Sequence, residues 1–254
     1  MKYTVLTLFP EITNVFFTAS IMAKAIERGI IQYRAINIRD FAKDKHKTCD
    51  DAPYGGGPGM LMLAEPLTLA LESAGVEKKA NAETVKKKLA IYLSPSGKPF
   101  NQAMAKEFAA MEELILVCGR YEGIDQRVID LYIDREISVG DYILSSGEIA
   151  ALAVIDSTYR LVDGVIRSES LEEESFSDGL LEYPQYTRPE IFDTIEVPEV
   201  LLSGHHENIR RWRLLERVKK TLCNRPDLIE QGRANKIFNK EINSIIGDIE
   251  NERN

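Results

Sequence analysis

The first 165 residues alternate between short apolar runs and segments in which apolar residues recur with a helical period. Short continuous runs are typical of strands buried on both faces, and they lie at 3–9, 30–38, 89–95, 114–119 and 135–144. Helical spacing connects them at 12–29, 65–74, 100–111, 124–133 and 147–162. Strands separated by helices predict an α/β domain with a mainly parallel sheet, in which ligands bind beyond the carboxyl ends of the strands.

The pattern changes near residue 165. Residues 166–184 are acidic, rich in serine and without a sustained period, so we interpret them as a flexible linker that orders when something binds. Helical patterns return at 205–224 and continue to residue 252. The sequence therefore predicts an α/β domain over 1–165, the acidic linker, and a small helical domain over 185–254.

Composition and charge narrow the class of protein. The 254 residues are 44% hydrophobic and 28% charged, as in an ordinary globular protein, and no apolar run reaches the roughly 18 residues of a membrane span. Cys49, Cys118 and Cys223 are odd in number and far apart, which predicts free thiols and a cytoplasmic location, with no membrane partner. The net charge of −8 argues against a general nucleic-acid coat, but seven Lys and Arg between 205 and 225 permit a focused contact.

Glycines follow several of the predicted strands. The segments 92–97, 117–125 and 138–148 place five of them around one rim, where backbone groups can hold a flat heterocycle. A fourth segment, "DDAPYGGGPGML" over 50–61, lacks the lysine that ends a phosphate-binding loop, and a polar stretch precedes it where a dinucleotide fingerprint needs a strand. Taken alone, it is most simply a tight surface turn.

The motifs together identify a family. "PYGGGPGM", "YLSP.G", "LVCGRYEGID.R", "S.GDY.LS.GE", "SF..GLLEYPQYTRP" and "SGHH..IR.WR" resemble, in order, the bacterial tRNA (guanine-N1)-methyltransferases of the SPOUT superfamily. The resemblance covers the chain from about residue 4 to about residue 228. It implies a mainly parallel α/β fold with a deep trefoil knot, a small all-helical C-terminal domain, and methylation of N1 of the guanine 3′ of the anticodon in tRNA.

The resemblance also implies that the methyl donor is S-adenosylmethionine, bound in a bent shape inside the knot. A neutral adenine needs backbone amides and an apolar slot, and Glu122 is the carboxylate placed to face the sulfonium. The last loop departs from the family by having Ser146 before Gly147 and an alanine at 150. The cofactor-binding residues carried over by motif are Tyr92, Leu93, Ser94, Pro95, Gly97, Gly119, Arg120, Tyr121, Glu122, Val139, Gly140, Asp141, Tyr142, Ile143, Leu144 and Gly147.

Methylation at N1 of guanine requires removal of a proton and stabilisation of the charge that spreads to O6, so a carboxylate and an arginine are needed. The family's arginine maps to Arg160. Its base, an aspartate before Ser-Phe, maps to Glu174, in a spacer one residue shorter than the family pattern. Asp178 is the rival base, whereas Glu172 and Glu173 are best explained as solvated linker charge.

The RNA surface is predicted from the basic helix. Arg210, Arg213, Arg217 and Lys220 form one stripe, which phosphate contact explains better than solvation once His205, His206 and Trp212 lie beside it. A second basic patch is Arg39, Lys43, Lys45 and Lys47. Family resemblance adds Asp50 and Gly59, because the glycine loop packs near the active site, where bare backbone approaches cofactor and base. The substrate-binding residues are therefore Asp50, Gly59, His205, Arg210, Trp212 and Arg213.

The resemblance further implies a homodimer with shared active sites and tRNA as partner. The family is described as needing Mg²⁺, but we assign no metal ligands, because the two adjacent histidines lack a third ligand at close spacing. Two alternatives stay open: another SPOUT RNA methyltransferase with a ribose 2′-O target, and a non-catalytic nucleotide-binding module.

Overall fold

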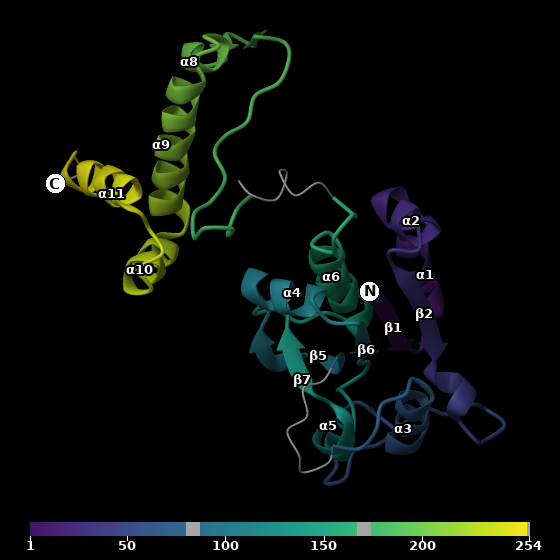
Figure 1. Cartoon of the computed structure of the whole chain (residues 1–254). Coiled ribbons are helices and arrows are strands. Elements are labelled where there is room, and N and C mark those ends of the chain that lie inside the picture. Colours follow the sequence, from purple (N-terminus) through teal and green to yellow (C-terminus); the bar gives the residue numbers. More distant parts are fainter. Residues whose placement is uncertain (80–86, 167–173, 253–254) are drawn as a thin grey trace. The chain divides into compact units, whose positions relative to one another are not determined.

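The structure is a computed structural model that describes residues 1–79, 87–166 and 174–252. The chain divides into two compact units, Met1–Ile166 and Arg167–Asn254, and each is described by itself (Figure 1).

The first unit is built on a five-stranded sheet with the order β2-β1-β6-β5-β7, in which every pairing is parallel. This arrangement confirms the predicted α/β class with a mainly parallel sheet. The strands are β1 (Lys2–Thr7), β2 (Gln32–Asn37), β5 (Lys88–Pro99), β6 (Glu113–Cys118) and β7 (Arg135–Ser138).

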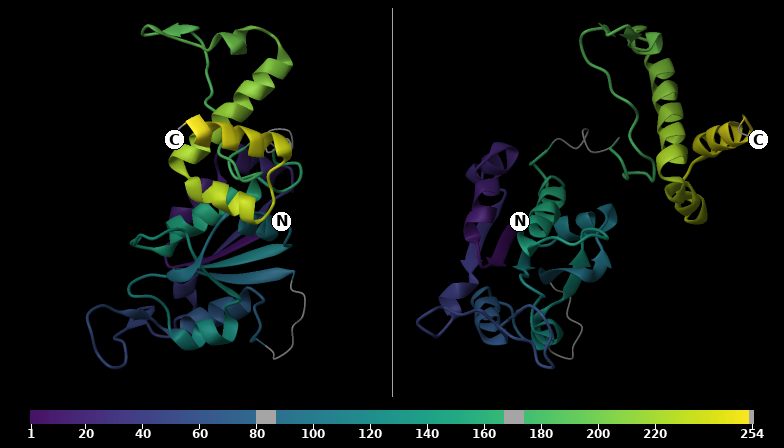
Figure 2. Two further views of the ribbon diagram at one scale, coloured as in Figure 1. Left: turned by 90° about the vertical axis from the view of Figure 1, so that its left-hand side faces the viewer. Right: turned by 180° about the vertical axis from the view of Figure 1, so that it is seen from behind.

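Helices cover both faces of this sheet, as Figures 1 and 2 show. Successive side chains of a strand point to opposite faces, so Leu114 and Leu116 pack in one core while Ile115 and Val117 pack in the other. The first core is closed by α1 (Pro10–Phe17), α2 (Ser20–Glu27), α4 (Gln102–Ala109) and α6 (Gly147–Tyr159). The second is closed by the 3₁₀ helix Ile38–Phe41, by α3 (Ala64–Ser73) and by α5 (Gln126–Tyr132).

Two local features differ from the sequence pattern. The helix predicted over 12–29 is two helices, because the chain turns at Ser20, whose φ of 55° lies outside the helical region. The glycine-rich segment 50–61 is the turn of a small antiparallel hairpin, β3 (Asp50–Asp51) with β4 (Leu61–Met62). A two-residue strand carries too little periodicity to be detected in a sequence.

In the second unit, residues 174–190 form turns and extended chain, the hairpin β8 (Ile191–Phe192) and β9 (Ile195–Glu196) follows, and most of the remaining described residues are helical. Its long helix α9 (His206–Asn224) follows α8 (Glu199–Leu202) and packs against α10 (Pro226–Ala234) and α11 (Lys240–Glu252) (Figure 1). The core between them is aliphatic and aromatic, and it consists of Leu180, Leu214, Val218, Ile229, Phe238, Ile242, Ile246 and Ile249.

The described part of the predicted linker, 174–184, packs on this helical core. Leu180 is fully buried, and the Leu181 backbone N–H donates to Thr221 Oγ1 at 2.9 Å. These contacts pack residues 180–181 on the helical unit, and the ordering of the linker on binding stays a prediction. Glu172 and Glu173 lie outside the described residues.

Candidate functional site

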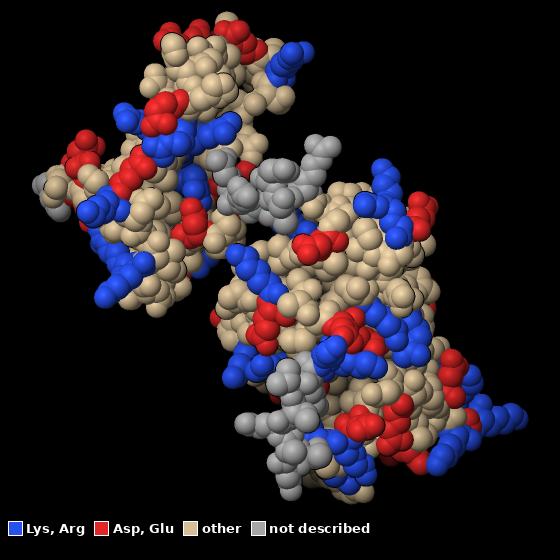
Figure 3. Space-filling model, viewed as in Figure 1, with Lys and Arg blue, Asp and Glu red and all other residues tan. Residues whose placement is uncertain are grey.

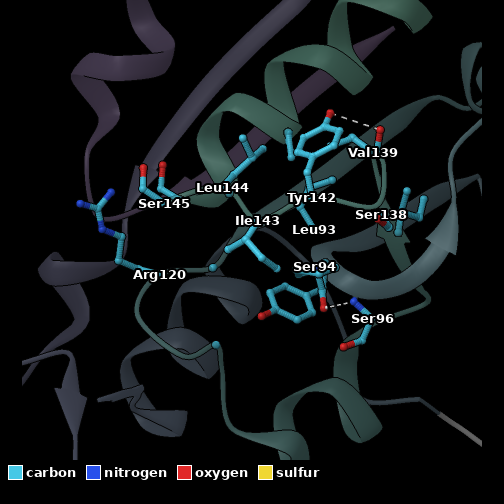
Figure 4. Close-up of a pocket in the computed structure, with 18 of the residues that line it drawn as sticks. Leu93, Ser94, Ser96, Arg120, Ser138, Val139, Tyr142, Ile143, Leu144 and Ser145 are labelled. Atoms are coloured by element: carbon cyan, nitrogen blue, oxygen red, sulfur yellow. Dashed lines mark hydrogen bonds between the residues drawn. The ribbon is translucent and has the colours of Figure 1, made fainter. Parts of the chain in front are cut away.

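Three loops enclose a cavity of about 390 Å³ at the carboxyl ends of β5, β6 and β7. They are the segments 92–96, 119–123 and 137–147, and Figure 4 shows their side chains around the opening. The carboxyl ends of parallel strands meet at one edge of a sheet, which is where α/β proteins bind ligands. This cavity is therefore the first candidate for the cofactor site.

All but two of the predicted cofactor residues line this cavity; Gly97 and Asp141 do not. Gly97 lies where β5 bulges against β7, since Leu93 and Lys98 both pair with Ile137. A Cβ on Gly97 would come within 2.3 Å of the Ile137 backbone nitrogen. Gly97 therefore shapes the bulge that presents 94–96 to the cavity, without lining it.

Two glycines allow the loops of the cavity to touch. A Cβ on Gly147 would meet the Gly119 nitrogen at 2.7 Å, and the Gly147 N–H donates to the Gly119 carbonyl at 2.9 Å. A Cβ on Gly119 would lie 2.9 Å from the Tyr92 ring. The segment that enters α6 thus packs backbone to backbone on the loop after β6, which no larger residue permits.

The remaining loop is held by short-range hydrogen bonds. Ser138 Oγ donates to the Gly140 carbonyl at 3.0 Å, and the Tyr142 hydroxyl donates to the Val139 carbonyl at 3.3 Å (Figure 4). Tyr121 has a φ of 56°, which is uncommon for an aromatic residue and is often found at functional sites. Burial raises the pKa of Tyr92 to about 12, so its phenol stays protonated at neutral pH.

A buried carboxylate joins the start of α6 to the end of β1 at this edge of the sheet. Glu148, in the first turn of α6, is 1% exposed, and its Oε1 accepts a hydrogen bond from Thr7 Oγ1 at the end of β1. A carboxylate at this position is also favoured by the helix dipole. Burial is the main cause of the raised pKa of the Cys118 thiol, and the charge of nearby Glu148 raises it further. The thiol therefore stays neutral.

The glycine loop reaches the rim of the same cavity. The Glu122 N–H donates to the Met60 carbonyl at 3.0 Å, and the Met62 N–H donates to the Gly123 carbonyl at the same distance. A Cβ on Gly59 would lie 2.5 Å from Glu122 Cγ, in a backbone conformation with φ of 88°. Gly59 is therefore required for contact with a cavity residue, whereas Gly55, Gly56 and Gly57 have open space around them.

The catalytic candidates lie on different units. Arg160 is the C-cap of α6 in the first unit, and Glu174 and Asp178 belong to the second. The Glu174 carbonyl accepts from Ser177 N and Oγ, which makes a tight turn. The Asp178 carboxylate binds Arg217 through both oxygens, with 2.9 Å from Nη1 to Oδ2, and Oδ1 also accepts from the Leu180 N–H.

The predicted basic stripe is largely paired. Arg217 is 8% exposed and bound to Asp178, so its predicted role as an exposed phosphate contact is wrong. Arg210 binds Glu207 at 3.0 Å and Glu241 at 2.8 Å. Figure 3 shows blue and red side chains interspersed over this face of the unit. The helical period of the sequence placed Arg217 on the exposed basic stripe of α9. The sequence did not reveal that residues 178–181 cover that side of the helix.

Other predicted substrate residues lie nearby. The Arg213 guanidinium stacks 4.6 Å from the centre of the Tyr183 ring, and Trp212 packs at 6.3 Å from Tyr186. His205 is exposed and precedes α9. In the first unit, Asp50 lies half-buried on β3, at the start of the glycine loop.

Several lining residues were not assigned to the cofactor from the sequence, although most of them belong to the segments 92–97, 117–125 and 138–148 that were predicted to form the rim. Their side chains carry no distinctive chemistry, and only their place within the three strand-end loops could have indicated them. They are Ser96, Gly123, Ile137, Ser138, Ser145, Ser146 and Ala150.

Two searches of the described residues bear on partners. No helix within 1–79, 87–166 and 174–252 has the length and apolarity to cross a bilayer. In the same ranges no group of three or more His, Cys, Asp or Glu side chains converges as a metal site would require.

The parallel sheet and the glycine-lined cavity at its carboxyl edge define an α/β protein with a cofactor-sized ligand site. Comparison with known proteins gives the family. Residues 1–231 match the model of the tRNA (Guanine-1)-methyltransferase TrmD family, and the chain belongs to this family.

Relatives named tRNA (guanine-N(1)-)-methyltransferase match along nearly the whole chain. The protein of Treponema denticola is 62% identical over 252 residues, covering 99% of this chain and 100% of its own length. That of Treponema pallidum is 55% identical over 252 residues, with 99% and 97% covered. That of Borreliella burgdorferi is 59% identical over 230 residues, with 90% and 92% covered.

Proposed function

We propose that this protein transfers a methyl group from S-adenosylmethionine to N1 of the guanine 3′ of the anticodon in tRNA. The observation that carries the proposal is family membership over residues 1–231, with 62% identity to a protein named for this reaction. A tRNA substrate favours the cytoplasm as the place where the protein works.

The residues of the cavity fit S-adenosylmethionine. Leu93, Ile143 and Leu144 give an apolar slot, and the glycine-rich loops offer backbone amides to a neutral base. Glu122 is the one acidic residue among those that line the cavity, and it suits a positively charged sulfonium. When bound, the cofactor supplies an electrophilic methyl group.

The proton on N1 must leave as the methyl group arrives, and we assign its removal to Glu174. Both Asp178 oxygens already accept N–H groups from Arg217, so proton uptake there would disrupt a pair that holds the helical unit together. Arg160 has a guanidinium suited to the negative charge that develops at O6. Since the described residues gather no metal-binding group, we route no step through Mg²⁺.

We further propose that the segment 139–147 is the threaded part of a trefoil knot. The backbone contact of Gly147 with Gly119 supports this proposal, because a threaded chain must pass its neighbours without side chains between them. The assembly is proposed as a homodimer, in which Glu174 of one subunit serves the cofactor cavity of the other.

The tRNA surface combines both units. Asp50 and Gly59 belong to the hairpin beside the cavity and are assigned to the guanine. His205, Arg210, Trp212 and Arg213 are assigned to the RNA backbone. Exposed ion pairs such as Arg210 with Glu207 and Glu241 contribute little to stability, so phosphate can replace these carboxylates.

The test is incubation with unmodified tRNA and methyl-labelled S-adenosylmethionine, followed by digestion to nucleosides. The proposal expects label in 1-methylguanosine, and none when the guanine 3′ of the anticodon is replaced by adenine. Label in 2′-O-methyl nucleosides would identify a ribose methyltransferase instead. Tight cofactor binding without transfer to any tRNA would favour the non-catalytic alternative.

A further inference from the structure

Two arginines share one aromatic ring beside the cofactor cavity. The Arg120 guanidinium lies 4.8 Å and the Arg39 guanidinium 5.9 Å from the centre of the Phe9 ring. All three side chains are half-buried. Within the part of the chain that the structure describes, no carboxylate oxygen lies within 4 Å of either guanidinium group.

Two lysines of the same basic patch are neutralised by carboxylates. Lys43 pairs with Glu65, and Lys47 pairs with Asp40 at 3.0 Å. Both guanidinium groups lie within 5.9 Å of the centre of one ring and neither has a carboxylate partner among the described residues, so both would attract an anion bound near that ring. Arginine also presents paired N–H donors that match the geometry of a phosphate.

The pair lies at both ends of the glycine loop. Arg39 Nη1 donates to the carbonyl of Lys47 at 3.5 Å, three residues before Asp50. Arg120 precedes the segment in which Glu122 contacts Gly59 and Met60. An anion bound here would therefore lie next to the loop assigned to the target guanine.

The direction of Arg120 separates this site from the cofactor cavity. Figure 4 shows its side chain running away from Leu93 and Ile143, although the residue is one of those that line the cavity. A cofactor carboxylate held in the slot would need the opposite orientation.

We infer that Arg39 and Arg120, held on Phe9, form a binding site for a backbone phosphate of the RNA beside the target guanine. The inference rests on the proposed function, because it takes RNA as the substrate. Phosphate contacts fix register without reading sequence, so this pair acts as a positioning device for the base.

The experiment compares Arg39→Ala, Arg120→Ala and the double variant with Arg127→Ala, a control whose exposed arginine pairs with Asp125 at 2.6 Å. tRNA affinity is measured by filter binding over a range of salt concentrations, and S-adenosylmethionine affinity by calorimetry. Each single variant should bind tRNA about five- to tenfold more weakly and reduce the slope of log K against log salt by about 1. Cofactor affinity should be unchanged in Arg39→Ala, whose residue does not line the cavity, and the control should match the parent protein.

Conservative variants keep the test valid if an alanine variant folds poorly. Arg120→Lys and Phe9→Leu retain the charges but lose stacking, and they should weaken tRNA binding with a smaller change in salt slope. Unchanged tRNA binding in folded double variants would overturn the inference, as would loss of cofactor affinity alone. If the parent protein forms no 1-methylguanosine, the proposed function fails instead, which is a separate result.

Discussion

At the scale of single residues, two carboxylates compete for the role of base, and their surroundings differ. Asp178 is bound by buried Arg217 through both oxygens, whereas Glu174 stands directly before the Ser-Phe pair that marks the base in the family. We expect Glu174→Gln to lower kcat by a factor of about 10² to 10⁴, as for a lost general base. Single-turnover methylation of tRNA measures the loss, and calorimetry should show unchanged cofactor affinity.

Asp178→Asn should affect stability more than chemistry. It leaves the Arg217 guanidinium without its charged partner in the helical core, which costs about 1–3 kcal/mol. Urea unfolding of this variant should therefore shift, while kcat at a temperature where it is folded stays near the parent value. An inactive but fully folded Asp178→Asn protein, together with an active Glu174→Gln protein, would make Asp178 the base.

Glu113, the first residue of β6, is a third informative carboxylate because its side chain is only 4% exposed. Burial acts to raise its pKa, but hydrogen bonds from Lys2 and Thr4 and the charge of Lys88 outweigh burial, so the pKa is lowered. A carboxyl with a lowered pKa in the folded state stabilises fully above its unfolded pKa of about 4.3. That stabilisation disappears as pH falls through the folded value.

Glu113→Gln should therefore cost about 1–3 kcal/mol at pH 7, and the difference from the parent should shrink below about pH 4. Urea unfolding at pH 7 and at pH 3.5 measures both values. The matched control is Glu112→Gln, since the neighbouring exposed Glu112 pairs with exposed Lys87 and its loss should change stability far less than the loss of Glu113. A pH-independent difference at Glu113 would mean that packing, not charge, explains it.

At the scale of elements, the bulge of β5 presents 94–96 to the cavity. A Cβ at Gly97 would meet the backbone of β7, which cannot move aside like a flexible side chain. Gly97→Ala should destabilise the protein by about 1–3 kcal/mol, as overpacking does, and weaken cofactor binding. Thermal unfolding and calorimetry test both effects.

Gly247 provides the matched control. It lies in α11 with open space around its Cα, so Gly247→Ala should be neutral or stabilise by about 0.5–1 kcal/mol. If both alanines have the same effect, the close approach of Gly97 to β7 does not matter for stability.

These elements also show what a sequence reveals. Long periodic segments gave the strands of the parallel sheet and helices such as α6 and α9, because burial on defined faces leaves a regular pattern. The loops that contain the sequence motifs predicted most of the residues that line the cavity. The pairing of Asp178 with Arg217, the break at Ser20 and the two-arginine arrangement on Phe9 depend on contacts between distant segments, which no local pattern encodes.

At the scale of the whole molecule, the groups of the proposed reaction are divided between the two units. The first contains the cavity and Arg160, and the second contains Glu174 and the helices assigned to RNA. Neither unit alone has all the groups that the proposed chemistry needs. A separation of this kind suits a dimer in which the units of two chains meet, because closed two-fold symmetry then builds two identical sites.

Mixed dimers test this arrangement. One subunit carries Glu174→Gln, and the other carries Ile143→Arg, which places a cation in the cofactor slot at a residue that is 81% exposed and outside the core. Each homodimer should be nearly inactive. A mixed dimer with shared sites has one intact cavity facing one intact Glu174, so it should recover about half the activity of the parent dimer.

Differently tagged subunits allow the mixed dimers to be purified away from both homodimers before the assay. The measured activity then belongs to the mixed dimers. Ile143→Arg alone should fail in cofactor calorimetry, while Glu174→Gln alone should bind the cofactor normally. If each chain used its own glutamate, the mixed dimer would combine one damaged base with one damaged cavity, and no site would be complete. Purified mixed dimers without activity would therefore place Glu174 with the cavity of its own chain.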